Sequence, residues 1–424
     1  MTTSSSRLPT DAVHDLALAE REPDIPRFLD VLSPARALAS LRDQFPRCAG
    51  VPAEPRVVYL RYKPGVSLTA AVRVRGAEPL LMLQAVSLRH RPKIEKLLTK
   101  QRHGAAGWGV VSDPPCLLVA GVPASDRYLP WLQRSGRGHP AVAGVELDGF
   151  RPLRYKPHRR WVATGVHDGR PCVVRVVPPA FAQRCSPTLG HLNAAGFIPG
   201  LRQDTRRGVS IQDWIDGEAL VDGSEERPPL ADVGLALARL HTLPHGPVRA
   251  APDHRSALDQ AAAAIAVLCP ALAVRARQLA TELGDGLPAD GPRVVSHGDF
   301  SDDQVVITPD GRVRLIDFDR ACVDHPAFDL GSWLSQELVN RHGAGTGRAP
   351  GIDPVVTSFR MLVDGYARAA PVPERPAIVA CTLAALLRRA VDPFRLRHPA
   401  WSEGIASRME LVEQLMAGRS QALR

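Results

Sequence analysis

The chain has 424 residues, of which 45% are hydrophobic and 23% are charged, and its formal net charge is +9. This length allows roughly two or three domains, and no apolar run is long enough to predict a membrane-spanning helix. The basic residues are dispersed and lack zinc-finger spacing or an RNP-like aromatic motif, so the positive charge predicts no nucleic-acid partner.

The ends and the cysteines bear on the cellular compartment. The amino-terminal segment is polar and contains no apolar stretch of the secretory type. The seven cysteines are scattered and form no CxxC pair, so neither a zinc site nor a disulfide framework is predicted. Arginine supplies most of the positive charge, which is typical of a GC-rich bacterial genome. We therefore expect a cytoplasmic bacterial protein.

Changes of composition along the chain predict four segments. We expect a mobile tail over residues 1–25 and an N-terminal domain over residues 26–145. A β-rich lobe with its connecting hinge is expected over 146–218, and a mainly helical lobe over 219–424. The fold class predicted is therefore α+β.

The pentapeptide LRYKP occurs twice, at residues 60–64 and 153–157. Each copy leads into an apolar strand-like run, SLTAAVRV or WVATGV, and then into a third, LLMLQAV or CVVRVV. Chance repetition of both the string and its downstream pattern is improbable, so we predict two related three-stranded β-units. The first unit is interpreted either as a cap on the second or as an inert structural appendage.

Helical patterns dominate after the second copy. A helix is expected near residues 179–196, and residues 229–244 carry a clear apolar stripe with the pattern LARLH. Residues 255–283 predict a helix interrupted at Pro270. The chain from residue 354 to its end again predicts helices.

The most informative stretch is VSHGDFSDDQVVITPDGRVRLIDFD at residues 295–319. Apolar runs on either side of Asp310-Gly311 predict a β-hairpin, because Asp-Gly is a strong hairpin-turn signal. The hairpin would bring Asp299 and Asp317 to the same end. One carboxylate could then orient an attacking hydroxyl while the other holds Mg²⁺ on the phosphates of a nucleotide. The alternative is an ordinary solvated loop.

HGDFSDDQ and LIDFD resemble the catalytic loop and the metal-binding segment of the aminoglycoside phosphotransferase and choline kinase superfamily. The resemblance covers roughly residues 146–424. It implies a bilobal protein-kinase-like fold, with a small β-rich N-lobe and a mostly helical C-lobe, preceded here by an extra β-containing domain. It also implies ATP or another nucleoside triphosphate, Mg²⁺, and a small-molecule hydroxyl acceptor, in a monomer or homodimer.

The resemblance implies a role for each matching residue. Asp299 would be the catalytic base and Asp317 the main Mg²⁺ ligand. His297 would brace the loop, and Asp329 in the sequence DLG would tie the following helix to it. Asp319 would be a further acid near the metal.

The chain departs from the superfamily pattern at several positions. Gln304 stands where the superfamily usually has Asn, and its longer side chain would place a second Mg²⁺ ligand differently. In the third strand the usual phosphate-binding Lys is replaced by Arg175, for which an exposed strand-edge charge is the alternative interpretation. The helix that follows has no acidic residue, and there is no GxGxxG motif. Asp213 and Trp214 lie in the hinge-like segment and would flank the adenine, unless Trp214 is an ordinary core residue.

Two functions from different classes fit these features. The first is an ATP-dependent phosphotransferase that acts on a hydroxyl of a sugar, an amino alcohol or an antibiotic-like molecule. Arginines outnumber acidic residues over 354–424, which does not favour a polycationic acceptor. The second is a pseudokinase that binds a ligand or partner without transfer, as the departures at Gln304 and Arg175 suggest.

Overall fold

The computed structural model describes residues 10–35, 37, 55–74, 80–102, 111–112, 117–121, 123–135, 141–142, 145–146, 148–220, 230–343 and 352–422. The chain divides into two compact units. Unit 1 consists of Met1–Ala182, Arg202–Ile211 and Asp392–Ile405, and unit 2 of Gln183–Leu201, Gln212–Val391 and Ala406–Arg424.

The segment expected to be a mobile tail contains helix α1 (Thr10–Glu20). Its Asp15 is only 5% exposed, and both Arg397 and the indole N–H of Trp401 donate hydrogen bonds to its carboxylate. A buried carboxylate is stable when it is paired in this way. Residues near the carboxyl end thus complete the core around the amino-terminal helix, and unit 1 is discontinuous in sequence.

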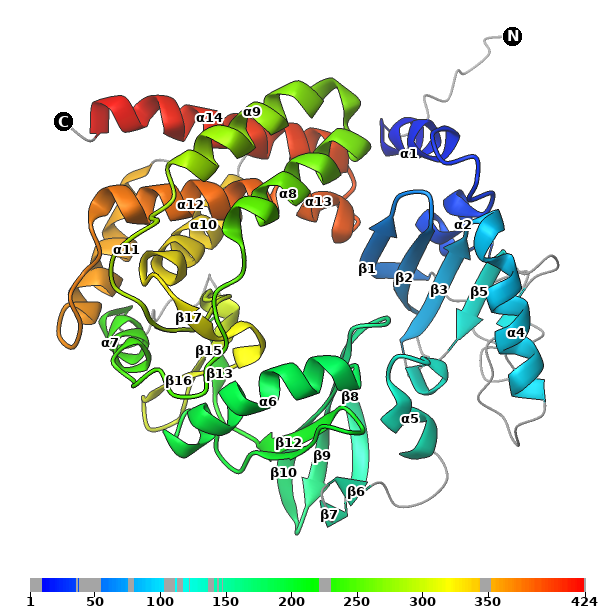
Figure 1. Ribbon diagram of the computed structural model, residues 1–424, viewed down its shortest axis with the longest axis horizontal. Helices are drawn as coiled ribbons and strands as arrows, with labels where there is room; N and C mark the ends of the chain where they lie inside the picture. The colour runs from blue at the N-terminus through cyan, green and yellow to red at the C-terminus, as the bar shows by residue number, and fades with distance from the viewer. Residues whose placement is uncertain are drawn as a thin grey trace, which may run out of the picture. The chain divides into compact units, whose positions relative to one another are not determined.

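The first LRYKP copy lies in a five-stranded antiparallel sheet with the order β1-β2-β3-β5-β4 (Figure 1). Ile94 from the following helix packs against Val86 and Val119 of the sheet. In chain order the elements are α2 (Phe28–Leu32), β1 (Arg56–Lys63), β2 (Ser67–Arg73), β3 (Leu81–Val86), α4 (Arg91–Arg102), β4 (Val111–Ser112) and β5 (Leu118–Gly121).

The second LRYKP copy lies in another five-stranded sheet whose strands follow the same order, β8-β9-β10-β12-β11. In chain order its elements are α5 (Pro130–Ser135), β8 (Asp148–Lys156), β9 (Arg160–His167), β10 (Arg170–Val176), α6 (Pro179–Ala194), β11 (Arg202–Asp204) and β12 (Val209–Asp213). A short pair, β6 (Ala141–Val142) and β7 (Val145–Glu146), precedes β8. The predicted duplication is confirmed, and it extends from three strands to five strands and a helix.

Strand register shows which residues of the two sheets are equivalent. Gln84 on β3 lies opposite Thr69 on β2, and Arg175 on β10 lies opposite Val162 on β9. Thr69 and Val162 occupy the same position after LRYKP in their respective copies. Gln84 is therefore the counterpart of Arg175.

The structure gives a physical reason for the repeated LRYKP string. In the first copy Glu22, which is 8% exposed, accepts hydrogen bonds from the hydroxyl of Tyr62 and from the backbone N–H of Gly65 at 2.9 Å. Gly65 has a φ of 64°, a left-handed conformation that glycine adopts without strain. The tyrosine and the tight turn after it are thus fixed by one carboxylate from the preceding segment.

The second copy repeats this arrangement with other residues. Asp126 is completely buried and accepts a 3.1 Å hydrogen bond from the Tyr155 hydroxyl and a 2.7 Å bond from the N–H of His158. His158 also has a left-handed φ, at 62°. The duplication therefore includes the segment before each sheet, which in both copies binds the tyrosine of LRYKP and the turn after it.

Unit 2 consists mainly of helices, and its helices agree with those expected from the sequence. The break at Pro270 is present, since α8 ends at Leu268 and α9 begins at Ala273. The helices are α7 (Leu230–His241), α8 (His254–Leu268), α9 (Ala273–Asp285), α10 (Ala327–Gly343), α11 (Ile352–Tyr366), α12 (Arg375–Arg389) and α14 (Trp401–Ala422), with the short α13 (Asp392–Arg395) belonging to unit 1. The α+β class with an N-terminal β-containing region is confirmed. None of the described helices has the length and apolarity that a membrane span requires.

Candidate active site

The predicted hairpin is present in unit 2 as β15 (Val305–Ile307) and β16 (Val313–Leu315). A third short strand, β13 (Glu218–Ala219), pairs with β15, which the sequence did not predict. Strand β14 (Val294–Ser296) precedes the HGD turn and pairs with β17 (Cys322–Asp324). The N–H of Ile316 donates to the carbonyl of Gln304 at 2.9 Å, which brings the residue preceding Asp317 beside the end of the HGD loop.

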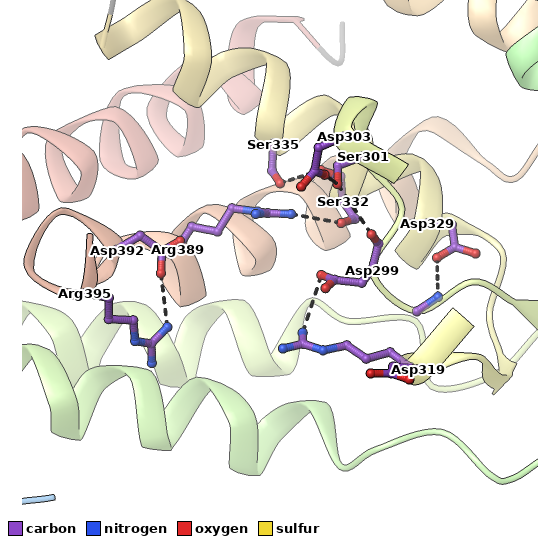
Figure 2. A network of polar contacts seen from close by, with 12 residues as sticks. Asp299, Ser301, Asp303, Asp319, Asp329, Ser332, Ser335, Arg389, Asp392 and Arg395 are labelled. Carbon is purple, nitrogen blue, oxygen red and sulfur yellow. Dashed lines mark hydrogen bonds and ion pairs between the residues drawn. The ribbon is translucent and has the colours of Figure 1, made fainter. Parts of the chain in front are cut away.

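Asp329 holds the HGD turn through two backbone hydrogen bonds. The N–H of His297 donates to one carboxylate oxygen at 2.6 Å and the N–H of Gly298 to the other at 2.8 Å. Figure 2 shows Asp329 with one of these bonds. The side chain of His241 donates to the same carboxylate at 3.0 Å, and its other ring nitrogen shares a 2.8 Å hydrogen bond with the hydroxyl of Tyr366. Asp329 is 1% exposed, so these partners replace its hydration.

Burial raises the pKa of Asp329, but the hydrogen bond and charge of His241, the charge of His297 and the N–H of Gly298 together outweigh it. The net pKa of Asp329 lies below its ordinary value. The carboxylate is therefore kept ionised where it orders the loop. A charged hydrogen bond of this kind contributes about 1.5–3 kcal/mol.

Gly298 is required by the close approach of two segments. Its φ is 78°, and a Cβ at this position would lie 2.2 Å from the carbonyl oxygen of Arg320. The side chain of His297 donates to the carbonyl of Ile316 at 2.8 Å. The loop that carries Asp299 and the segment that carries Asp317 are thus joined by contacts on both sides.

The surroundings of Asp299 are positively charged. The Arg320 guanidinium lies 3.4 Å from the Asp299 carboxylate, which is 41% exposed at its side chain. Burial lowers the pKa of Arg388, and repulsion from Arg320 and Arg389 lowers it further, against the attraction of Asp299. Arg389 itself donates to the hydroxyl of Ser332 at 3.3 Å (Figure 2). Asp299 is thus an accessible carboxylate among arginines.

Gln304 and Asp317 are the candidates for a cation site. Gln304 is 7% exposed, and over the described part of the chain its side-chain amide has no hydrogen-bond partner. Asp317 has a left-handed backbone, with φ 63° and ψ 52°, an unusual conformation for a residue other than glycine. Among the described residues, no three acidic, histidine or cysteine side chains form a metal cluster.

This donor set fits Mg²⁺ bound together with phosphates. Mg²⁺ keeps several waters and is usually held by one or two carboxylates and substrate phosphates, not by an all-protein cage. One carboxylate and one amide oxygen are sufficient for such a site. Asp319 lies in the next turn, where its carbonyl accepts a 2.8 Å hydrogen bond from Arg249.

Arg249 was not predicted from the sequence, yet it fixes the segment after Asp317. Its guanidinium donates to the carbonyls of Asp319 and Ala321, both at 2.8 Å, and its own N–H donates to Thr188 on α6. His241, Tyr366 and Arg320 were missed in the same way. Only His241 had a signal, because it ends the LARLH pattern.

The predicted nucleotide-binding residues are divided between the units. Arg175 lies in unit 1, on the central part of the second sheet. Asp213 and Trp214 belong to unit 2, where the N–H of Asp213 donates to the carbonyl of Pro199 at 3.0 Å. Trp214 is 36% exposed, so the alternative of an ordinary core residue is wrong. Helix α6 is present where it was expected, without an acidic residue.

Part of the chain matches a known protein family. Residues 157–396 match the model of the family described as "Phosphotransferase enzyme family". No curated protein matches the chain.

Several solved structures share part of the arrangement. A choline kinase from Streptococcus pneumoniae is 13% identical, with a TM-score of 0.46 over 64% of this chain and 94% of that one. A macrolide 2'-phosphotransferase from Brachybacterium faecium is 20% identical, with a TM-score of 0.43 over 65% of this chain and 96% of that one. A spectinomycin phosphotransferase, solved with ADP and spectinomycin, is 12% identical, with a TM-score of 0.44 over 65% and 94%.

Proposed function

This chain belongs to the phosphotransferase enzyme family, and we propose that it transfers the γ-phosphate of ATP to a hydroxyl of a small molecule. The observation that carries the proposal is the HGD loop, whose backbone is clamped by the buried Asp329 while Asp299 stays accessible. Phosphoryl transfer relies on positioning and electrostatics more than on covalent chemistry by the protein. A held loop that presents the accessible carboxylate of Asp299 suits that requirement.

Asp299 would orient the acceptor hydroxyl and take up its proton as the new bond to phosphorus forms. A general base must lie within hydrogen-bond reach of that proton, and the accessible carboxylate of Asp299 satisfies this condition. Asp317 and Gln304 would hold Mg²⁺, which would neutralise charge on the phosphates. Asp319 would support Asp317 from the neighbouring turn. His297 and Asp329 would position the loop.

On the nucleotide side, Arg175 would contact phosphate oxygens, because a guanidinium can bind phosphate in a bidentate way. Asp213 and the exposed Trp214 would flank the base at the hinge. The alternative is a pseudokinase that binds a ligand or a partner without transfer. It is favoured by the absence of an acidic residue on α6, the helix that carries the partner carboxylate in protein kinases.

The arginines around Asp299 bear on the acceptor. A polycationic acceptor would be repelled by Arg320, Arg388 and Arg389, since like charges near one site are unfavourable. A neutral or anionic molecule with a free hydroxyl fits better. Sugars and antibiotic-like natural products with few amino groups belong to this class.

The metal role of Asp317 can be tested by thermal unfolding with ATP in the presence and absence of Mg²⁺. Saturation at about 100 times the dissociation constant stabilises a protein by roughly 2.7 kcal/mol, which corresponds to a shift of about 5 °C or more. We expect a Mg²⁺-dependent shift in the native chain that is lost in Asp317→Ala and kept in Asp310→Ala, a hairpin-turn control.

The two functions predict different outcomes in a second assay. ATP consumption is measured with a panel of sugars, amino alcohols and antibiotics as acceptors. Acceptor-dependent consumption that disappears in Asp299→Asn supports the phosphotransferase. A Mg²⁺-dependent thermal shift without any acceptor-dependent turnover supports the pseudokinase, and a native chain with neither would contradict both assignments.

A further inference from the structure

A pocket of about 240 Å³ lies in unit 1, between the first sheet, helix α4 and the segments that carry Arg127 and His158. None of the HGD or IDFD residues lines it, and neither does Arg175. Six basic side chains line it: Arg61, Lys63, His90, Lys93, Arg127 and His158. They come from β1, α4, the turn before α4, the segment before α5 and the turn between β8 and β9.

The charge of the lysines and arginines in this pocket is not neutralised by an ion pair within the described part of the chain. Over the described residues, Arg61, Lys63, Lys93 and Arg127 form no ion pair with a carboxylate. The nearest acid, Asp126, is buried and already accepts hydrogen bonds from Tyr128, Tyr155 and His158. Clustered like charges cost free energy in the empty protein, so a ligand of opposite charge would relieve this repulsion.

The pKa of His158 is affected by the same basic side chains. The pKa of His158 is lowered to about 4, mainly by burial and also by the positive charges of Arg61, Arg127 and Lys63, against the attraction of Asp126. His158 is therefore neutral at physiological pH. The permanent positive charge of the pocket comes from its four lysine and arginine side chains, Arg61, Lys63, Lys93 and Arg127.

The rest of the pocket wall combines polar and apolar side chains, which suits a small organic molecule. Gln84 and Thr69 contribute polar side chains to the lining, and the amide of Gln84 donates to the hydroxyl of Thr69 at 3.0 Å. Val66, Val86 and Ile94 line another side and provide an apolar surface. The volume is just below the roughly 300–1,000 Å³ of pockets for drug-sized ligands.

Comparison of the two duplicated sheets also indicates a separate anion site in the first one. Gln84 is the counterpart of Arg175 by strand register, and Lys63 is the counterpart of Lys156 in the second LRYKP copy. The first sheet has no cation at the Arg175 position. It gathers cations instead from β1, α4 and the Arg127 segment, on the face that Gln84 occupies.

We propose that this pocket binds a small molecule that carries a phosphate monoester. A monocarboxylate would leave most of the four cations without a partner, whereas a dianionic phosphate offers three oxygens to lysine and arginine donors. The proposal concerns a second ligand site and does not depend on the proposed transfer reaction.

The test uses isothermal titration of the full chain with inorganic phosphate, pyrophosphate and glycerol 3-phosphate, each without Mg²⁺ or nucleotide. We expect saturable binding that is about 10-fold weaker or more in Lys63→Gln and in Lys93→Gln, because each removes a charge-assisted hydrogen bond. Lys96→Gln removes the same charge from α4 outside the pocket and should keep native affinity. Both lysines to be replaced are exposed, so folding is not at risk, and circular dichroism checks it.

Two results would overturn the proposal. One is an absence of saturable binding with all three probes at millimolar concentration. The other is binding that survives Lys63→Gln and Lys93→Gln but is lost in Arg175→Gln, which would assign the phosphate to the second sheet. Tighter binding of glycerol 3-phosphate than of inorganic phosphate would further support a phosphate monoester with an organic body.

Discussion

Replacement of Asp299 by Asn is expected to reduce kcat by about 10²–10⁴-fold, the usual contribution of a general base. Asn keeps the size of the side chain but cannot take the proton of the acceptor hydroxyl. The nucleotide affinity should change little, because Asp299 is proposed to act on the acceptor and not on the phosphates. Initial rates at saturating ATP and calorimetric ATP binding measure the two effects separately.

A matched control for Asp299→Asn is Asp310→Asn, which lies in the exposed turn at the far end of the same hairpin. It should leave both kcat and nucleotide affinity unchanged. If Asp299→Asn retained native turnover, Asp299 would not be the base. If it lost nucleotide affinity in proportion to kcat, the residue would belong to the nucleotide side of the site.

Replacement of Asp329 by Asn is expected to destabilise unit 2 by about 3–5 kcal/mol, the usual cost of breaking a buried charged pair. The carboxylate accepts hydrogen bonds from the N–H groups of His297 and Gly298 and from the side chain of His241. An amide has only one acceptor oxygen, so at least one of these buried donors would face the NH₂ group of the Asn side chain. Urea denaturation monitored by tryptophan fluorescence would measure the loss.

The control for Asp329→Asn is Asp253→Asn. Asp253 caps helix α8 by accepting the N–H of Ser256 at 3.1 Å, and Asn is an equally good N-cap. The unfolding midpoint should therefore stay close to that of the native chain. An Asp329→Asn variant as stable as this control would show that the clamp does not hold the loop.

The lowered pKa of Asp329 also predicts a pH dependence. A carboxyl whose pKa is lower in the folded state contributes its full stabilisation above the unfolded pKa of about 3.9. That contribution is lost as the pH falls through the folded pKa. The native chain should therefore lose stability steeply below about pH 4, and Asp329→Asn should show a shallower loss over the same range.

Local patterns predicted the elements that carry the site. Asp310-Gly311 and the apolar runs on either side specify the hairpin, and Pro270 specifies the break between α8 and α9. These signals lie within a few residues of the structure they determine, so a single sequence contains them. The duplication was also visible, because a repeated string needs no knowledge of contacts.

The partners of the site were not predictable in the same way. Arg249 binds the carbonyls of Asp319 and Ala321, and Tyr366 reaches the HGD loop only through His241 and Asp329. Backbone carbonyls have no signature in the sequence, and the residues that meet them are far apart along the chain. Arg320 beside Asp299 was missed for the same reason, although it is only one turn from Asp317.

The sequence alone determined the α+β class, the duplicated β-unit, and the HGD and IDFD segments that indicate phosphoryl transfer. Short-range physics is sufficient for these, since turn residues, strand periodicity and helix stripes act locally. Only the tertiary structure showed that one buried carboxylate clamps the HGD turn, and that basic side chains from several segments line a pocket beside the first sheet. Both depend on side chains from separate segments that share a small volume, and this is decided by packing and not by local pattern.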